Sequence, residues 1–563
     1  MDFKKEFAKI LSKETKLTEV QILDILEVPP NQNLGDLAFP CFMLAKQLKK
    51  APQQIAKDLV QKLKSNSFEK FESVGPYINA FVNKSLFAEE ILTKIQKEKT
   101  KYGSGKEKEK IVVEFCSPNT NKPLHLGHIR NMALGDAVTK LLKFSGKEVK
   151  AVQIINDRGV HICKSMLAYE KYGKNEKPKK KGDHFVGDYY VIFAKEAKEN
   201  PELENEAQEM LKKWEEKDPH VRALWKKMNK LVIEGFEETY TRFGVKFDKN
   251  YFESDFYEKG KEIAQEGLKK GIFIKDEKGA IVAPLKEQNL SDKIILRADG
   301  TSVYITQDLY LAELRYNEFK YDKLIYVVAS EQNLAFQQLF KILELLKRKF
   351  AKGLFHLSYG MVHLPSGRMK SREGTVIDAD DIMDEMTNLA KEEIKKRYKD
   401  LTEKEIDQRA EAIGLAAIKF FMLKTDFVKD MIFNPEESLS FEGETGPYLQ
   451  YTHARANSIL KKANQKTSKI KYQLLKEPQE RTIIQLLSQF PEKIEESAEH
   501  YKPHILCRYL LDLAQAFNEF YHACPVISEN KEQMQARIIL VQSTKQVLAN
   551  GLTLLGIKTL EEM

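Results

Sequence analysis

The stretch "IVVEFCSPNTNKPLHLGHIRNMALGDA", residues 111 to 137, predicts a strand, a loop and a helix in succession. It opens with a β-branched apolar run, which is typical of a short buried strand. Its later apolar residues recur at helical spacing. A second strand is predicted by "VKAVQII" at 149–155. Two strands around one helix indicate a parallel crossover unit, and therefore an α/β domain.

Two histidines, His125 and His128, lie three residues apart where the predicted helix begins. Ligands of parallel sheets bind at the carboxyl ends of the strands, and a helix N-terminus attracts phosphate. Both rings can donate to phosphate oxygens as charge builds in a transition state, and Lys122 can add a full charge. Gly127 allows close approach. The pattern favours a nucleotide-binding site. The alternative is that the two histidines lie on the surface of a loop and bind nothing.

A second basic element follows about 240 residues later, in "SGRMKSREGTVIDADDIMDEM" at 366–386. Arg368, Lys370 and Arg372 lie in a short loop between glycines. Such a loop can close over a triphosphate and stabilise departing pyrophosphate. The alternative is a solvated turn.

Length and composition limit the class of protein. The 563 residues suggest several domains, roughly three of about 150 residues each. The net charge of +8 permits contact with a polyanion without demonstrating one. We expect no secretory signal and no membrane span. The five scattered cysteines form no Cys-x-x-Cys pair, which argues against zinc and disulfides and for a reducing cytoplasm.

The chain divides into segments of different pattern. Residues 1–105 mix helical and strand patterns and end in a charged linker. Residues about 171–290 interrupt the α/β pattern and are predicted to be an insertion, which opens with a basic loop at 174–183. The α/β pattern resumes with "DKIIL" and "KLIYVVAS". From about 380 the chain is predicted to be helical to its end.

The two basic elements together resemble a known signature. "HLGH" resembles the His-Ile-Gly-His motif of class I aminoacyl-tRNA synthetases, and "RMKSR" resembles their Lys-Met-Ser-Lys-Ser loop. Wider segments resemble the arginyl-tRNA synthetase family: "NLGDLAFPCFMLAK", "EFCSPNTNKPLHLGHIRN", "DGTSVYITQDLYLA", "IYVVASEQN", "GETGPYLQYTHARA" and "LLDLAQAFNEFYHACPVI".

The resemblance implies an α/β Rossmann-like catalytic domain with a parallel sheet and an insertion. It would be flanked by an N-terminal α+β domain that touches the tRNA elbow and by a C-terminal all-α helical bundle that binds the anticodon. The implied boundaries are 1–105 for the N-terminal domain with its linker, 106–380 for the catalytic domain, 381–445 for a helical region that contacts the acceptor stem, and 446–563 for the bundle.

The resemblance also implies the residues that bind arginine. A guanidinium is a permanently charged fork of five donors, so its site needs carboxylates and carbonyl acceptors. Each candidate has a structural alternative as a core residue, a helix cap or a loop cap, and the division between guanidinium and α-amino group stays open. The implied residues are Glu114, Asn119, Tyr304, Asp308 and Gln332, together with Glu253.

The implied reaction joins arginine to tRNA(Arg) through arginyl-adenylate, with ATP and Mg²⁺ as a substrate complex, no zinc, and bound tRNA needed for activation. Because the loop at 368–372 diverges from the Lys-Met-Ser-Lys-Ser pattern, it stays open which of its cations contacts the phosphates. The family suggests that Lys122 partly substitutes for the standard loop. Asp157 and His161, in a stretch that differs from the commoner "GDWG" form, are possible rim residues. Predicted catalytic residues are His125, His128, Lys122 and Lys370; predicted ATP-binding residues are Gly127, His125, His128, Arg368, Met369, Lys370, Ser371 and Arg372.

Aromatic and cationic side chains recur near the start of the implied bundle. RNA recognition uses stacking of splayed bases on such groups, so Tyr448, Tyr451 and Arg455, near His453, are predicted to contact tRNA. The tyrosines could equally be helix core. Whether the basic loop touches tRNA stays open, and the family suggests a monomer.

Three other readings are weighed. A nucleotidyltransferase of the His-x-Gly-His type is usually shorter and lacks a helical C-terminal third. A cysteinyl-tRNA synthetase needs a zinc ligand set, which the scattered cysteines do not supply. A non-catalytic RNA-binding relative would be favoured by loss of the histidines, Asp308 or the basic loop, and all are present.

Overall fold

The computed structural model describes residues 1–563 except 1–2, 32–33, 175, 366–376 and 464–469. The chain forms two compact units. One contains residues 1–102, 455–489 and 513–547, and the other contains residues 103–454, 490–512 and 548–563. The second unit holds His125, His128 and Lys122.

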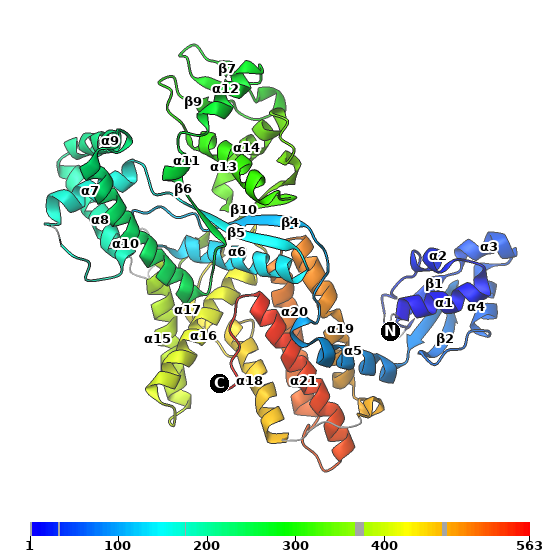
Figure 1. Ribbon diagram of the computed structural model, residues 1–563. Helices are drawn as coiled ribbons and strands as arrows, with labels where there is room; N and C mark the ends of the chain where they lie inside the picture. Colours follow the sequence, from blue (N-terminus) through cyan, green and yellow to red (C-terminus); the bar gives the residue numbers. More distant parts are fainter. Residues whose placement is uncertain (1–2, 32–33, 175, 366–376, 464–469) are drawn as a thin grey trace. The chain divides into compact units, whose positions relative to one another are not determined.

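A five-stranded parallel sheet is the centre of the second unit (Figure 1). Its strands lie in the order β11-β10-β4-β5-β6, and every neighbouring pair is parallel. The predicted crossover is confirmed, because the first two strands pair in parallel and α6 connects them. The strands are β4 (Lys110–Glu114), β5 (Glu148–Ile155), β6 (Lys249–Phe252), β10 (Lys323–Ala329) and β11 (Leu354–Tyr359).

The strand order places the change of direction between β4 and β10. The chain runs outward from β4 through β5 to β6, and then returns to build β10 and β11 on the other side. In such sheets the ligand crevice lies outside the carboxyl ends of the two strands at the change of direction. The loop after β4 therefore leads the chain into that crevice just before α6 (Leu126–Phe144).

α6 packs on the sheet through an unusually close approach at Gly135. The helix contacts β4, β5 and β10. A Cβ atom added at Gly135 would lie 2.3 Å from Cγ of Phe115, the residue that follows β4. The Phe115 ring thus occupies the space that a side chain on α6 would need, and the start of the helix is held near the end of the strand.

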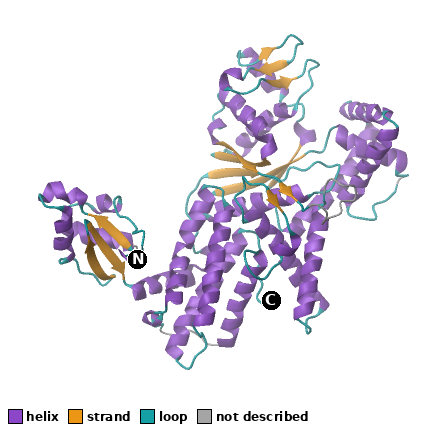
Figure 2. Ribbon diagram, turned by 180° about the vertical axis from the view of Figure 1, so that it is seen from behind, coloured by secondary structure: helices purple, strands orange, loops and turns teal. Residues whose placement is uncertain are grey.

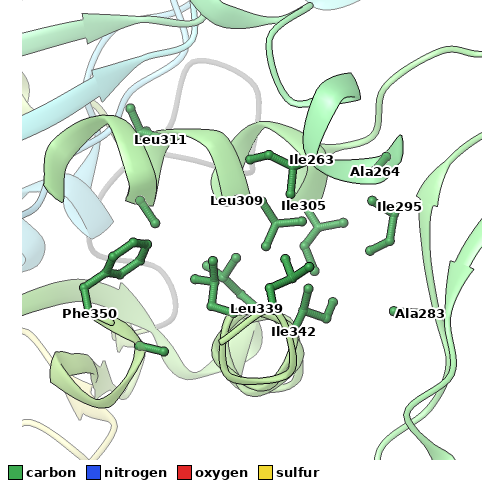
Figure 3. Packing of buried hydrophobic residues seen from close by; sticks show 14 of the residues in the cluster. Ile263, Ala264, Ala283, Ile295, Ile305, Leu309, Leu311, Leu339, Ile342 and Phe350 are labelled. Atoms are coloured by element: carbon green, nitrogen blue, oxygen red, sulfur yellow. The ribbon is translucent and has the colours of Figure 1, made fainter. Parts of the chain in front are cut away.

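A large apolar cluster packs against the sheet, and Figure 3 shows the side chains of some of its residues. Strand alternation directs Val112 and Leu324 into it. Leu309, Leu339 and Ile342 are fully buried in the same cluster. Its other elements are α12 (Lys261–Lys269), α13 (Tyr304–Phe319), α14 (Asn333–Leu345) and a small antiparallel sheet of β7 (Ile274–Lys275), β8 (Ile281–Ala283) and β9 (Lys293–Leu296).

Two expectations about the middle of the chain are wrong. The predicted insertion at about 171–290 is not one inserted segment, because β6 lies within it and pairs with β5 in the main sheet. The "DKIIL" run does not return to the parallel sheet, because it forms β9 of the small antiparallel sheet. β6 has only four residues, of which Tyr251 alone is buried, and two of the four are polar, so its sequence lacks the apolar run of a central strand.

Helices form most of the rest of this unit. The segment between β5 and β6 folds into four helices, and the segment after β11 is largely helical, as predicted, with one short parallel pair of strands, β12 and β13. These elements are α7 (Val160–Tyr172), α8 (Gly182–Glu199), α9 (Glu202–Glu215), α10 (Pro219–Phe243), α11 (Glu253–Phe256), β12 (Val362–His363), α15 (Ala379–Arg397), α16 (Glu403–Leu423), β13 (Met431–Ile432) and α17 (Pro435–Ser438).

The first unit contains a three-stranded antiparallel sheet in the order β1-β3-β2, with helices packed on it (Figure 2). Phe7 and Phe39 are fully buried in its core. Tyr102 Oη donates to the carbonyl of Leu487 at 2.9 Å, which ties the linker to a C-terminal helix. The elements are α1 (Phe3–Thr15), α2 (Glu19–Leu23), β1 (Leu37–Pro40), α3 (Phe42–Leu48), α4 (Pro52–Val60), β2 (Phe68–Val74), β3 (Tyr77–Val82) and α5 (Lys84–Glu98).

Four long C-terminal helices complete the chain, and parts of each belong to both units. They are α18 (Gly446–Ala463), α19 (Pro478–Glu499), α20 (Pro503–Ala523) and α21 (Lys531–Leu554). Among the described helices, none combines the length and apolar character needed to cross a bilayer.

We expect the substitution Gly135→Ala to destabilise the protein. Replacing glycine by alanine inside a helix normally gains about 1 kcal/mol. Here the new methyl group meets the Phe115 ring, and such overpacking costs about 1–3 kcal/mol. Thermal unfolding followed by circular dichroism should show a lower midpoint. The double variant with Phe115→Leu should recover part of the loss, and a raised midpoint for Gly135→Ala alone would contradict the packing.

Candidate active site

The two histidines of the motif form the start of α6. His125 is the N-cap residue, with extended backbone angles. Its Nδ1 accepts a hydrogen bond from the backbone N–H of Gly127 at 3.1 Å, and Nδ1 of His128 accepts from the backbone N–H of His125 at 3.1 Å. Two imidazoles thus make the reciprocal contacts of a capping box. Because each Nδ1 is an acceptor, each Nε2 carries the proton and can donate.

Both rings are neutral near pH 7. Burial, assisted by the charge of Lys122, lowers the pKa of His125 to about 4. Burial and the neighbouring charges of His125 and Lys122 lower the pKa of His128 well below its ordinary value. The ring centroids lie 4.0 Å apart. The predicted residues His125, His128 and Lys122 therefore lie close together. They offer two neutral N–H donors beside one cation.

A strained turn leads from β4 to the motif. Cys116 and Ser117 have φ values of 75° and 49°, in the left-handed region that residues other than glycine rarely adopt. Such backbone is retained only where its surroundings impose it, and it is common at functional sites. Burial raises the pKa of the Cys116 thiol to about 12, so this cysteine is not a nucleophile.

Asn131 on α6 holds that turn in place. Its Oδ1 accepts from the backbone N–H of Cys116 at 2.5 Å. Its Nδ2 donates to the carbonyl of Val327 at 2.8 Å and to Oη of Tyr359 at 3.0 Å. One amide therefore joins the ends of β4, β10 and β11. Sequence reasoning missed this residue, because its spacing in the helix is that of any buried position.

Arg130 makes a similar connection to the segments around β12 and β13. Its guanidinium donates to the carbonyls of Met361, Phe427 and Lys429 at 2.8, 3.0 and 2.7 Å. The side chain is 1% exposed. This buried arginine satisfies three carbonyls at once and fixes the segment that precedes residue 366. Sequence reasoning missed it as well.

A cavity of about 580 Å³ lies beside the loops that follow β4 and β5. Four predicted residues line it: Asn119, His161, Glu253 and Tyr304. The Tyr304 side chain is 78% exposed, which rules out a core role for it.

Glu253 lines this cavity, whereas Glu114, the last residue of β4, does not, and both are buried. Glu114 forms an ion pair with Arg315, a fully buried arginine of α13. Glu253 accepts a hydrogen bond from Gln307 at 3.1 Å and lies 3.7 Å from Nη1 of Arg158. Each of these two carboxylates therefore already faces one guanidinium of the chain itself.

Asp308 differs from the other two carboxylates. It forms no ion pair with any residue that the structure describes. Burial, together with the charges of Glu114 and Glu253, raises the pKa of its carboxyl to about 7, although the charges of Arg315 and Lys293 oppose them. Asp308 is thus a carboxylate without an ion-pair partner among the described residues, so it suits a positively charged ligand.

The comparisons with known proteins agree with this geometry. A model of class I tRNA synthetase (R) catalytic domains matches residues 90–435. Models of the arginyl-tRNA synthetase N-terminal domain and of the DALR anticodon-binding domain match residues 1–82 and 449–563. The chain belongs to the arginyl-tRNA synthetase family. The domain boundaries predicted from the sequence stay predictions; the catalytic-domain match runs past 380 to 435.

Individual relatives cover nearly the whole chain. The arginine–tRNA ligase of Treponema denticola is 46% identical, over 96% of this chain and 94% of its own. That of Bacteroides thetaiotaomicron is 44% identical, over 94% of each. The solved structure of Thermus thermophilus arginyl-tRNA synthetase superposes with a TM-score of 0.76 at 28% identity, covering 96% of each chain. Membership of this family overturns the nucleotidyltransferase and cysteinyl readings.

Several predicted features do not line the cavity, and the arginine-binding candidates Glu114 and Asp308 are among them. Gln332 is exposed, at the end of the short turn Ser330–Gln332 after β10, and does not line the cavity. Asp157 is buried and accepts from the backbone N–H and Oγ of Ser254 at 2.8 and 2.6 Å, so it supports the loop and is not a rim residue. The predicted loop residues 368–372 lie outside the described part of the chain.

The predicted tRNA contacts on α18 are half-buried: Tyr448, Tyr451 and Arg455. Arg455 donates to Oδ1 of Asn518 at 2.5 Å. His453 is buried, and its Nδ1 lies 2.9 Å from the carbonyl of Leu560, so this side chain packs inside the protein. The other three stay predictions.

We expect His125 and His128 to remain neutral, with the proton on Nε2, between about pH 5.5 and 8, because both Nδ1 atoms accept backbone hydrogen bonds. Nitrogen-15 NMR of histidine-labelled protein, assigned with the variants His125→Gln and His128→Gln, measures the tautomer directly. The exposed His220 is the internal control, because its ring donates a hydrogen bond to the Glu170 carboxylate, which raises its pKa, and it should titrate. Titration of either motif ring near pH 6.5 would show that the capping contacts are wrong.

Proposed function

We propose that this chain, an arginine–tRNA ligase by family, uses the crevice between β4 and β10 for both steps of its reaction. The carboxylate of L-arginine attacks the α-phosphate of MgATP, which gives arginyl-adenylate and releases pyrophosphate. A hydroxyl of the terminal adenosine of tRNA(Arg) then attacks the adenylate carbonyl, and AMP leaves. Positioning and charge stabilisation provide most of the rate, as in other phosphoryl-transfer reactions.

The histidine pair is assigned to the triphosphate. Neutral Nε2–H groups of His125 and His128 donate to phosphate oxygens whose charge grows as the pentacoordinate phosphorus forms. Lys122 supplies the full positive charge near them. The loop residues Arg368, Met369, Lys370, Ser371 and Arg372 keep their predicted part in holding ATP, and Lys370 its predicted catalytic part.

The unpaired carboxylate of Asp308 carries the assignment of arginine as the substrate. A half-buried carboxylate with a pKa raised to about 7 is stabilised by an arriving guanidinium, which is charged at every accessible pH. We assign the guanidinium to Asp308 and Glu253, with Tyr304 at the cavity wall. Asn119 lies on the loop that leads to His125, so we assign it to the reacting end of the substrate. Glu114 and Gln332 keep their predicted part in arginine binding.

The remaining assignments follow the family. Residues 449–563 match the anticodon-binding model, so we assign Tyr448, Tyr451 and Arg455 to tRNA contact at that end. We propose that the enzyme acts as a monomer in the cytoplasm. Mg²⁺ enters with ATP as part of the substrate, and no zinc is assigned.

ATP–pyrophosphate exchange with each of the twenty amino acids, with and without tRNA, tests the proposal. We expect exchange with arginine alone and only when tRNA is present. Exchange with a different amino acid would mean that the carboxylate cluster has been assigned to the wrong substrate. Absence of exchange under every condition, from folded protein, would support the non-catalytic relative.

We expect the affinity for arginine to fall as the pH drops below about 7. The raised pKa makes Asp308 neutral below that value, and a neutral carboxyl does not pair with a guanidinium. KM for arginine should therefore rise about tenfold for each pH unit below the pKa. Isothermal titration at pH 7 to 8 should also show proton release on binding.

The variant Asp308→Asn should raise KM for arginine on the order of 100-fold and remove this pH dependence. Asp255→Asn is the matched control, because Asp255 lies near the site on α11 and is exposed. A pH profile that survives in Asp308→Asn would place the titrating group elsewhere.

A further inference from the structure

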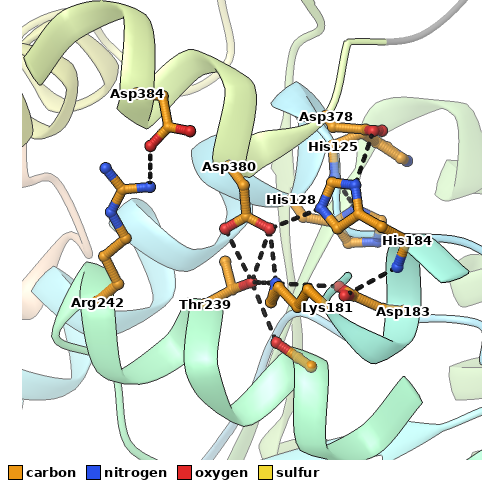
Figure 4. Close-up of polar contacts among 11 residues, drawn as sticks. His125, His128, Lys181, Asp183, His184, Thr239, Arg242, Asp378, Asp380 and Asp384 are labelled. Carbon is orange, nitrogen blue, oxygen red and sulfur yellow. Dashed lines mark hydrogen bonds and ion pairs between the residues drawn. The ribbon is translucent and has the colours of Figure 1, made fainter. Parts of the chain in front are cut away.

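Three helices, α8, α10 and α15, provide a polar cluster beside the histidine motif (Figure 4). Lys181 Nζ, just before α8, lies 2.6 Å from Oδ2 of Asp380 and 3.1 Å from Oδ2 of Asp183. His184 Nε2 lies 2.9 Å from the same oxygen of Asp380. Thr239 of α10 accepts from Lys181 and donates to Oδ1 of Asp380 at 3.2 Å. Asp380 is therefore held by three side chains at once.

The segment that carries Asp380 is paired with the motif itself. His125 and Asp378 form an antiparallel bridge. The backbone N–H of Leu126 donates to the carbonyl of Ile377 at 3.1 Å, and that of Ala379 donates to the carbonyl of Leu124 at 2.8 Å. His184 Nδ1 also lies 3.5 Å from Oδ2 of Asp378. Fixing residues 377–380 therefore fixes the backbone on either side of His125.

The cation in this cluster is a lysine of the chain. Asp183, His184 and Asp380 have the spacing of a metal site, with one ligand atom of each within 4.8 Å of the others. The Lys181 ammonium, however, contacts two of these three residues. Burial would raise the pKa of Asp380, but the hydrogen bonds from His184 and Lys181 lower it to about 2, so Asp380 remains a charged anchor.

Lys181 also differs from its neighbours in the basic run "KPKKK". The Lys179 side chain is 86% exposed and pairs with Glu176 in the same loop. The Lys181 side chain is 17% exposed and points into the cluster. One lysine of the run thus has an internal partner, whereas Lys179 lies on the surface.

We propose that Lys181 and His184 are positioning residues for ATP binding. They hold Asp378 and Asp380, and the paired backbone transmits that constraint to His125. Neither side chain contacts the substrate. The inference rests on the proposed role of His125 in ATP binding.

Steady-state ATP–pyrophosphate exchange, with full-length protein, arginine and tRNA, tests the inference. Lys181→Met should raise KM for ATP on the order of tenfold and leave KM for arginine within twofold, because the motif shifts while the arginine cavity does not. Lys181→Arg keeps the charge and should retain most of the affinity. Lys179→Met is the matched control and should behave as the unmodified protein.

A second variant covers the case in which Lys181→Met does not fold, since it leaves two buried carboxylates without their cation. The double variant Lys181→Met with Asp380→Asn removes one charge of each sign and should fold. It should still show the raised KM for ATP, because the anchor is lost.

The outcomes distinguish the positioning role of Lys181 from the ATP-binding role of His125 on which it depends. If His125→Ala raises KM for ATP and the Lys181 variants do not, the positioning role is wrong and the role of His125 stands. If His125→Ala has no effect, both are wrong. If Lys179→Met and Lys181→Met both raise KM for tRNA and leave KM for ATP unchanged, the basic run contacts RNA and the inference is overturned.

Discussion

The amide of Asn131 is the contact on which the geometry of the crevice depends. It accepts from the turn after β4 and donates to the ends of β10 and β11. Losing it would leave three buried polar groups without partners and would release a turn whose backbone is strained. Arg130, which precedes Asn131 in α6, donates hydrogen bonds to three carbonyls of the segments around β12 and β13. Through these two neighbours, α6 acts as the common frame for strand ends that are far apart in the sequence.

The proposed active site has one region suited to a negatively charged ligand and another suited to a positively charged ligand. At the helix start, half-buried neutral imidazoles and the helix N-terminus form a region suited to phosphate. Deeper in the sheet, Arg315 satisfies Glu114, while Asp308 has no partner among the described residues. An arginine of the chain thus neutralises one carboxylate of a site that is proposed to receive arginine. A fully balanced pocket would have no electrostatic preference for a cation, and a wholly uncompensated one would destabilise the fold.

Much of this architecture could be predicted from the sequence. β4, α6 and β5 follow from two apolar runs and one helical period, and the resemblance of the flanking segments indicated the family. β6 could not be predicted, because a four-residue edge strand that begins with two polar residues and buries one side chain has no distinctive periodicity. The burial of Asp157 and the exposure of Gln332 could not be predicted either. Each residue follows a strand in the same way, and only the packing of α10 and α11 against Asp157 distinguishes the two positions. The pairing of Lys181 with Asp380 joins residues 199 apart, beyond any local signal.

The capping contacts of His125 and His128 explain why the two histidines are separated by two residues. In a helix, the N-cap side chain reaches the first free N–H groups, and the side chain three positions later reaches back to the N-cap N–H. An imidazole can do either with one nitrogen and keep the other for a ligand. The interval in the motif is therefore set by the helix, not by the nucleotide. One residue more or less between the rings would rotate the second ring by about 100° around the helix axis.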